Sequence, residues 1–149
     1  MRRKNQPTTV LLVEDNEIDA RMVLRAARSS RLANHIQVVT DGAQALDYLH
    51  RRPPFADAPY PHLVLLDLNL PGIDGRDVLA EMKADDTLRH IPVVILTSST
   101  LEQDVLASYR GDAAAFVTKP VGLDGFLKVV EAVECFWIDV VTLPEVAVG

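Results

Sequence analysis

The chain has 149 residues, of which 48% are hydrophobic and 24% are charged, and its formal net charge is −6. This length fits one domain that can bury a core, and the hydrophobic share argues against a disordered chain. The negative charge argues against a nucleic-acid binder that relies on overall attraction to phosphates.

The sequence has no feature typical of a membrane protein, a disulfide-stabilised protein or a zinc protein. Its apolar runs are shorter than the roughly 18 residues of a membrane-spanning helix. The run Thr9–Val13, which follows the basic N-terminus, is too short for a signal peptide. We therefore expect a cytoplasmic protein. Cys135 is a lone cysteine in an apolar helical stretch, which predicts a packed thiol, and the histidines show no ligand spacing with it.

The first half of the chain predicts two strands, each followed by a helix. Val10–Val13 is a short β-branched block, and a helix begins near Asn16, a good N-cap. The block Ile36–Val39 predicts the second strand, and a helix covers about residues 43–50. Residues 51–61 contain four prolines and predict an extended surface loop.

The second half repeats this alternation three times. In chain order it predicts a strand at Leu63–Leu66, a helix at about 76–84, a strand at Pro92–Leu96, a helix at about 101–109, a strand at Ala114–Val117 and a long helix from near Leu123. Continuous apolar strands that alternate with helices are typical of an α/β protein with a parallel sheet covered on both faces. Function in such a sheet belongs at the carboxyl ends of the strands.

Polar residues close four of the predicted strands and form one chemically consistent set. They are Glu14 and Asp15 after the first strand, Asp67 after the third, Thr97 and Ser98 after the fourth, and Lys119 after the fifth. Crowded carboxylates repel one another, and a divalent cation such as Mg2+ offsets that cost. Each residue alone has an ordinary explanation as a helix cap, a turn or a polar loop, but the conjunction favours a site.

This set of residues suits phosphoryl transfer. The Asp67 carboxylate can act as a nucleophile and form an aspartyl phosphate. The cation and Lys119 would neutralise charge on the transferring group, and the Thr97 hydroxyl could donate a hydrogen bond to a phosphoryl oxygen.

With these residues in place, the chain resembles the response-regulator receiver domains of two-component signalling. The matching segments are Leu-Leu-Val-Glu-Asp-Asn at 11–16, Leu-Leu-Asp-Leu-Asn-Leu-Pro-Gly-Ile-Asp-Gly at 65–75, Ile-Leu-Thr-Ser at 95–98 and Phe-Val-Thr-Lys-Pro at 116–120. The resemblance runs from about residue 9 to about residue 132. It implies a doubly wound (βα)5 flavodoxin-like receiver fold with a five-stranded parallel sheet of order 2-1-3-4-5.

The resemblance also implies a role for each matching residue. Asp67 would be the phosphoacceptor. Asp15, Asp67 and the backbone carbonyl of Asn69 would bind Mg2+, with Glu14 acting through water. The residues that contact the phosphoryl group or take part in the switch would be Lys119, Thr97, Ser98 and Phe116.

The proline-rich loop and the Glu-Cys-Phe-Trp near the C-terminus resemble single-domain receivers that pair with phytochrome-type histidine kinases. We expect a flexible N-terminus at 1–8, a receiver domain at 9–138, and a C-terminal extension at 139–149 without an attached output domain. The output would be phosphorylation-dependent binding to another protein, without direct contact with nucleic acid or membrane.

Two helical faces suggest partners. Arg21, Arg25 and Arg28 share one stripe, which is either a kinase-docking face or a solvated basic face. The last helix has two apolar stripes, of which a sheet needs one. We assign Leu123, Phe126, Leu127, Val130, Val133 and Trp137 to the sheet, and Val129, Ala132, Phe136 and Val140 to a second stripe. The second stripe predicts a homodimer, unless the C-terminal extension covers it.

Three other interpretations each fit part of the sequence. A phosphorylation-independent receiver-like interaction module should lack part of the acidic set, which is complete here. A phosphatase of the aspartyl-phosphate type needs a second acid two residues after the nucleophile, where this chain has Asn69. A flavodoxin-like electron carrier needs a phosphate-binding loop after the first strand, where Glu14 and Asp15 would repel phosphate. We expect a signalling protein that at most dephosphorylates itself slowly, rather than an enzyme.

Overall fold

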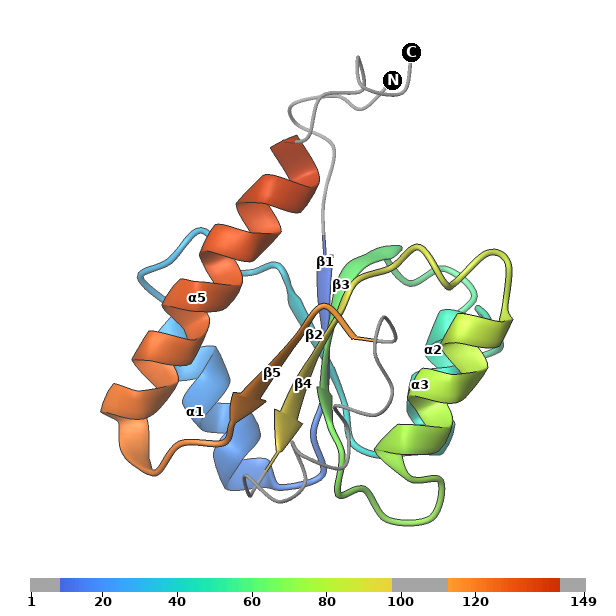
Figure 1. Ribbon diagram of the computed structural model, residues 1–149, viewed down its shortest axis with the longest axis horizontal. Helices are drawn as coiled ribbons and strands as arrows, with labels where there is room; N and C mark the ends of the chain where they lie inside the picture. The colour runs from blue at the N-terminus through green and yellow to red at the C-terminus, as the bar shows by residue number, and fades with distance from the viewer. Residues whose placement is uncertain (1–8, 98–112, 143–149) are drawn as a thin grey trace.

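Five short β-branched and leucine-rich segments form one parallel sheet of order β2-β1-β3-β4-β5, which confirms the predicted fold. The computed structural model describes residues 9–97 and 113–142, and for residue 97 and residues 136–142 it describes the backbone alone. The strands are β1 Thr9–Val13, β2 Ile36–Val39, β3 Pro61–Asp67, β4 Val93–Thr97 and β5 Ala115–Thr118. Figure 1 shows their ends gathered at one edge of the sheet.

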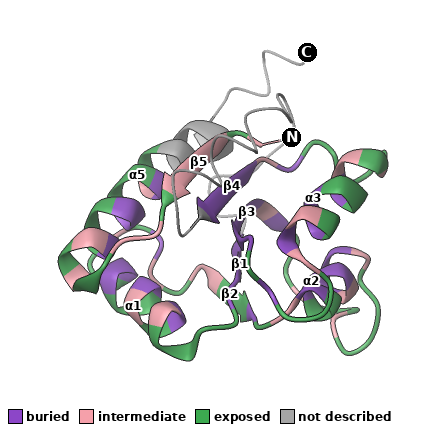
Figure 2. Ribbon diagram, turned by 60° about the horizontal axis from the view of Figure 1, so that its bottom comes forward, coloured by how far each residue is buried: buried purple, intermediate pink, exposed green. Residues whose placement is uncertain are grey.

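The burial of each strand explains its sequence. Every residue of β1 is buried, and so is every residue of β3 except His62. Both strands lie inside the sheet with helices over both faces, so their side chains are apolar in both directions. β2 is at an edge, and its residues Gln37 and Val38 are exposed. Figure 2 shows buried residues along the strands and exposed residues on the outer sides of the helices.

Four helices cover the sheet within the described ranges, and they are α1 Glu17–Ala27, α2 Gly42–Leu49, α3 Gly75–Ala84 and α5 Gly122–Thr142. Figure 1 shows α1 and α5 on one face and α2 and α3 on the other. Asn16 caps α1 as predicted, because its side chain accepts a hydrogen bond from the backbone N–H of Asp19 at 3.0 Å. The predicted helix at 101–109 lies outside the described residues.

The packing of α5 differs from the predicted stripes. Phe126, Val130 and Val133 are buried as predicted, but Val129 is also buried, and Leu127 is 40% exposed. The sheet-facing stripe is therefore centred between Phe126 and Val133, because residues at i, i+3, i+4 and i+7 share one side of a helix. Cys135 is exposed, so the prediction of a packed thiol is wrong.

The proline-rich segment lies on the surface but is not extended. Its first part forms consecutive turns, in which the N–H of Phe55 donates to the carbonyl of Arg52 and the N–H of Ala58 donates to the carbonyl of Phe55. The Phe55 ring packs 5.3 Å from the Tyr48 ring, centroid to centroid, and Phe55 contacts the core. Phe55 and Ala58 thus pack against the core, which is consistent with a folded path for this loop.

In the part of the chain that the structure describes, no helix is long and apolar enough to cross a bilayer.

Candidate phosphoryl-transfer site

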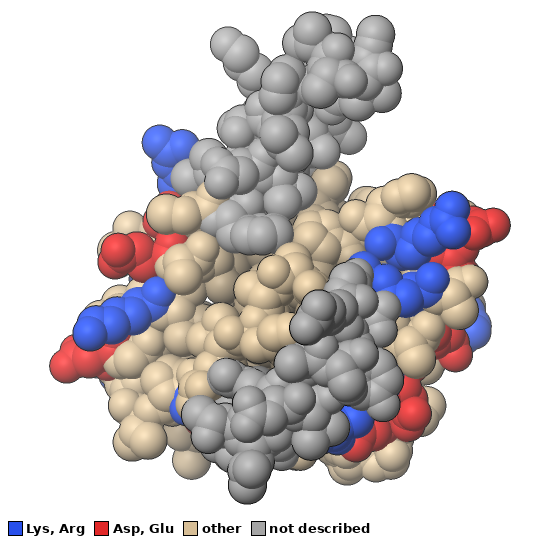
Figure 3. All heavy atoms as spheres, in the orientation of Figure 1, with Lys and Arg blue, Asp and Glu red and all other residues tan. Residues whose placement is uncertain are grey.

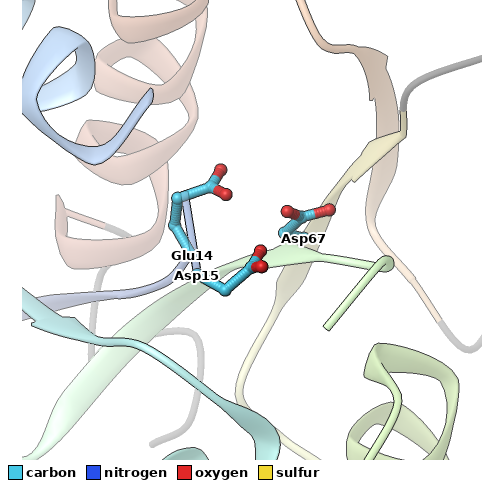
Figure 4. A group of neighbouring side chains, drawn as sticks. All are labelled: Glu14, Asp15 and Asp67. Carbon is cyan, nitrogen blue, oxygen red and sulfur yellow. The ribbon is translucent and has the colours of Figure 1, made fainter. Parts of the chain in front are cut away.

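Three acidic side chains meet at the carboxyl ends of β1 and β3. Glu14 and Asp15 directly follow β1, and Asp67 is the last residue of β3, because it still pairs with Leu96 of β4. One carboxylate oxygen from each of the three residues lies within 4.8 Å of the others. Figure 4 shows Asp15 and Asp67 directed toward a common space, with Glu14 beside them. The parallel order of the strands produces this meeting, since neighbouring strands end at one edge.

The three carboxylates differ in exposure. Glu14 is fully buried and Asp67 is 3% exposed, whereas Asp15 is exposed to solvent. The backbone N–H of Asn69 donates to Asp67 Oδ1 at 3.0 Å, which fixes the orientation of that carboxylate. The site is therefore buried at Glu14 and Asp67 and accessible to solvent at Asp15.

Lys119 brings a positive charge into this acidic group. Its Nζ donates to Asp67 Oδ2 at 3.0 Å and lies 2.9 Å from Glu14 Oε1. Lys119 was predicted at the same strand edge, and in the structure it directly contacts two of the predicted acids.

Burial and charge determine how these groups bind protons. Burial raises the pKa of Glu14 to about 8, and the neighbouring Asp67 carboxylate adds to this rise against the attraction of Lys119. Burial works against the charged form of Lys119, but hydrogen bonds to Glu14, Asp19 and Asp67 outweigh it and raise the pKa of Lys119. At neutral pH the proton on Glu14 and the positive charge of Lys119 therefore both reduce the repulsion among these carboxylates.

The stability of the metal-free protein should consequently fall as pH rises from about 5 to about 8. In the unfolded chain the Glu14 carboxyl loses its proton near 4.5, and in the folded protein near 8. The folded state binds more protons between these values, so the free energy of unfolding decreases with pH there. Lys119 keeps its proton in both states over this window. Urea unfolding in chelator at several pH values measures the effect, and Glu14→Gln should remove most of the slope. A slope unchanged by that substitution would contradict the assignment to Glu14.

The donor set fits a hard divalent cation. All three side chains offer carboxylate oxygens, which Mg2+ and Mn2+ prefer. Asp15 and Asp67 face the shared space and could ligate the ion directly, with Glu14 beside them.

The remaining predicted site residues are placed less completely. Thr97 ends β4, with its backbone alone described, and Ser98 lies outside the described residues. Phe116 is half-buried in β5 and packs against the core cluster on the side of α2 and α3. Asn69 is exposed in the loop after β3.

One residue of this site, Asp19, is not among the predicted site residues. Asp19 belongs to the first turn of α1 rather than to a strand end, yet its Oδ2 lies 2.9 Å from Lys119 Nζ. No pattern in the sequence distinguishes Asp19 from Glu17, the other acid in the first turn of α1, because the packing of α1 decides which of the two faces Lys119.

Comparison with known proteins agrees with this geometry. Residues 10–131 match the family described as the response regulator receiver domain. The response regulator Rcp1 of Synechocystis sp. is 42% identical over 140 residues, which cover 94% of this chain and 95% of that protein. The probable methanogenesis regulatory protein FilR2 of Methanothrix harundinacea is 37% identical over 132 residues, which cover 89% of this chain and 84% of that protein.

Solved structures resemble the fold as a whole. The phosphorylated cyanobacterial phytochrome response regulator RcpA gives a TM-score of 0.79 at 42% identity, over 87% of this chain and 93% of that one. The Mn2+-bound form of Rcp1 gives a TM-score of 0.80 at 41% identity, over 93% of this chain and 99% of that one. A family match over most of the chain, joined to this sheet order and acidic edge, establishes that the chain belongs to the response regulator receiver domain family.

Proposed function

We propose that this chain accepts a phosphoryl group from the phosphohistidine of a sensor histidine kinase onto Asp67, in a reaction that needs Mg2+. The observation that carries the proposal is the meeting of Glu14, Asp15 and Asp67 with Lys119 at one sheet edge. Receiver domains are signalling proteins rather than turnover enzymes, so the phosphorylated chain would act by binding another protein. Its self-dephosphorylation would be slow.

In the proposed transfer an oxygen of Asp67 attacks the phosphorus, the P–O bond forms, and the N–P bond to the imidazole breaks. The departing imidazole keeps the electron pair of that bond and takes up a proton. The N–H of Asn69 holds the carboxylate in orientation, and Lys119 Nζ, now 3.0 Å from Asp67 Oδ2, is in reach of a phosphoryl oxygen. A bound Mg2+ would neutralise charge on the transferring group. The backbone carbonyl of Asn69 would be a further ligand of this ion, and Glu14 would contact the ion through a bound water.

The switch residues remain part of the proposal. Thr97 ends the strand beside Asp67, so its hydroxyl could turn toward the phosphoryl group, and the small Ser98 next to it would keep the group accessible. Phe116 sits in the edge strand β5 and would change its packing when Thr97 moves.

The surface around the site supports kinase docking. Ile18 on α1 is 68% exposed and Val121, just after Lys119 and Pro120, is 97% exposed. Arg21 and Arg25 are exposed along α1. Apolar side chains beside a basic stripe suit a helical phosphohistidine domain. RcpA is a phytochrome response regulator, and the similarity to it over most of the chain supports a phytochrome-type kinase as the partner.

The charge distribution supports a protein partner over nucleic acid. On the face seen in Figure 3, basic and acidic side chains lie side by side along the flanks, and the described atoms between them are largely uncharged. A nucleic-acid binder needs a continuous basic surface instead.

A homodimer through α5 completes the proposal. The last turns of α5 contain Phe-Trp-Ile-Asp-Val-Val at 136–141. A segment this apolar is expected to be buried against another surface, and a second copy of the chain would supply one. Light scattering at tens of micromolar should give the mass of a dimer, and a monomer mass would rule this part out.

The phosphoryl-transfer proposal is tested by intact mass after incubation with acetyl phosphate. With Mg2+ the protein should gain one phosphoryl group, and with excess chelator none. The absence of an adduct, even with a cognate kinase supplied, would favour the phosphorylation-independent interaction module.

A further inference from the structure

Lys119 has three carboxylate partners, and one of them does not belong to the acidic cluster. Its Nζ lies 2.9 Å from Glu14 Oε1, 3.0 Å from Asp67 Oδ2 and 2.9 Å from Asp19 Oδ2. An ammonium group has three N–H donors, so these three carboxylates can use all of them. The Lys119 and Asp19 side chains are only 16% and 23% exposed, so solvent screens this contact weakly.

The three partners have unequal roles toward a cation. Glu14 and Asp67 belong to the acidic cluster, so Lys119 competes with a cation for their oxygens. Asp19 lies outside that cluster and is free to keep its contact with Lys119 when the other two carboxylates turn to the ion. Its place in the first turn of α1, behind the Asn16 cap, fixes where it holds the ammonium.

We propose that Asp19 is a positioning residue that anchors Lys119 and thereby favours binding of the divalent cation. The inference rests on the proposed function, because the cation site is the one in which Asp67 would be phosphorylated. When the cation binds, Lys119 gives up part of its contact with Glu14 and Asp67 and remains beside the site through Asp19. Without Asp19 the ammonium has only the cation's own ligands as partners, and the two positive charges compete directly.

The chain offers a matched control for this idea. Glu17 is also an acid in the first turn of α1, but its side chain is 76% exposed and pairs with Arg21 instead of Lys119. Asp19→Asn and Glu17→Gln remove the same charge from the same helical turn. A general loss of negative charge, or of a favourable charge at the helix N-terminus, affects both variants. The loss of the Lys119 anchor affects Asp19→Asn alone.

The experiment measures the Kd of the full-length chain for Mn2+, from the electron paramagnetic resonance signal of free Mn2+, and the Kd for Mg2+ by competition. Asp19→Asn should weaken both by about three- to tenfold, which is typical of side chains that share one salt-bridge network. Glu17→Gln should change them by less than about twofold, as an exposed pair does. In a Lys119→Met background, Asp19→Asn should also have less than about a twofold effect, because there is no ammonium left to anchor.

The outcomes separate this inference from the proposed function. If the unaltered chain binds the cation and Asp19→Asn matches Glu17→Gln, the anchoring role is wrong while the site stands. Equal effects of Asp19→Asn with and without Lys119 would likewise overturn it, since the carboxylate would then act by its charge alone. If the unaltered chain binds neither cation, the cation site and the anchor fail together.

Discussion

Asp67→Asn should abolish the Mg2+-dependent phosphoryl adduct. The amide that replaces the carboxylate is a poor nucleophile, and Asp67 is the only one of the three clustered acids that lies at the centre of the sheet, between β1 and β4. The substitution should leave the fold intact, because the amide oxygen of asparagine can still accept the hydrogen bond from the N–H of Asn69. Intact mass after acetyl phosphate treatment measures the loss.

Asp74→Asn is the matched control for this variant. Asp74 lies seven residues further on, caps α3 through a hydrogen bond from the N–H of Arg76 at 2.8 Å, and can keep that bond as asparagine. It should be phosphorylated like the unaltered chain. A full adduct on Asp67→Asn would place the phosphoryl group on another residue and refute the assignment of the acceptor.

Gly75→Ala should destabilise the protein by about 2–3 kcal/mol, although alanine is ordinarily the better helix residue. An alanine Cβ at this position would lie 2.5 Å from the backbone carbonyl oxygen of Asp67 and 2.7 Å from the Cα of Leu68. Both are backbone atoms of a buried segment, so neither can move away cheaply. Urea or thermal unfolding measures the loss of stability.

The same substitution should slow phosphorylation by about tenfold or more, because a shift of the Asp67 backbone misplaces the attacking oxygen. Gly72→Ala serves as the control. Gly72 has φ 68°, and a Cβ added there would have no atom within 4 Å. Gly72→Ala should therefore cost about 1 kcal/mol of backbone strain and leave Asp67 in place. A Gly75→Ala protein more stable than the original would show that helix propensity outweighs the contact with Asp67.

The strands could be predicted from the sequence because buried parallel strands must be apolar on both sides. The prediction of Ile36–Val39 matches β2, and the prediction of Val10–Val13 is one residue shorter than β1. The third strand was predicted too short at both ends, because its outer residues include the polar Asp67 and a proline. Asp67 is part of β3 because it pairs with Leu96, and Pro61 opens the strand, a position where the missing N–H costs little.

The elements that were misjudged depend on contacts with distant residues. The proline content of residues 51–61 indicated a loop, but its first part forms turns in which Phe55 packs against Tyr48. The pattern of α5 was apolar on more than one side, so the sequence was compatible with several rotations of the helix. Packing against the sheet selected the side with Val129 and left Leu127 exposed.

By itself, the sequence determined the alternation of strands and helices and the set of polar residues that end the strands, because both follow from local pattern and from where each strand stops. It therefore brought Glu14, Asp15, Asp67 and Lys119 to one edge. Only the tertiary structure decided that Lys119 also contacts Asp19, since the two residues are a hundred positions apart and meet only because α1 lies near the end of β5 in the fold. It also decided that Glu14 is fully buried while Asp15 is exposed, because both follow a strand that is covered on both faces, and only the packing of the surrounding elements distinguishes them.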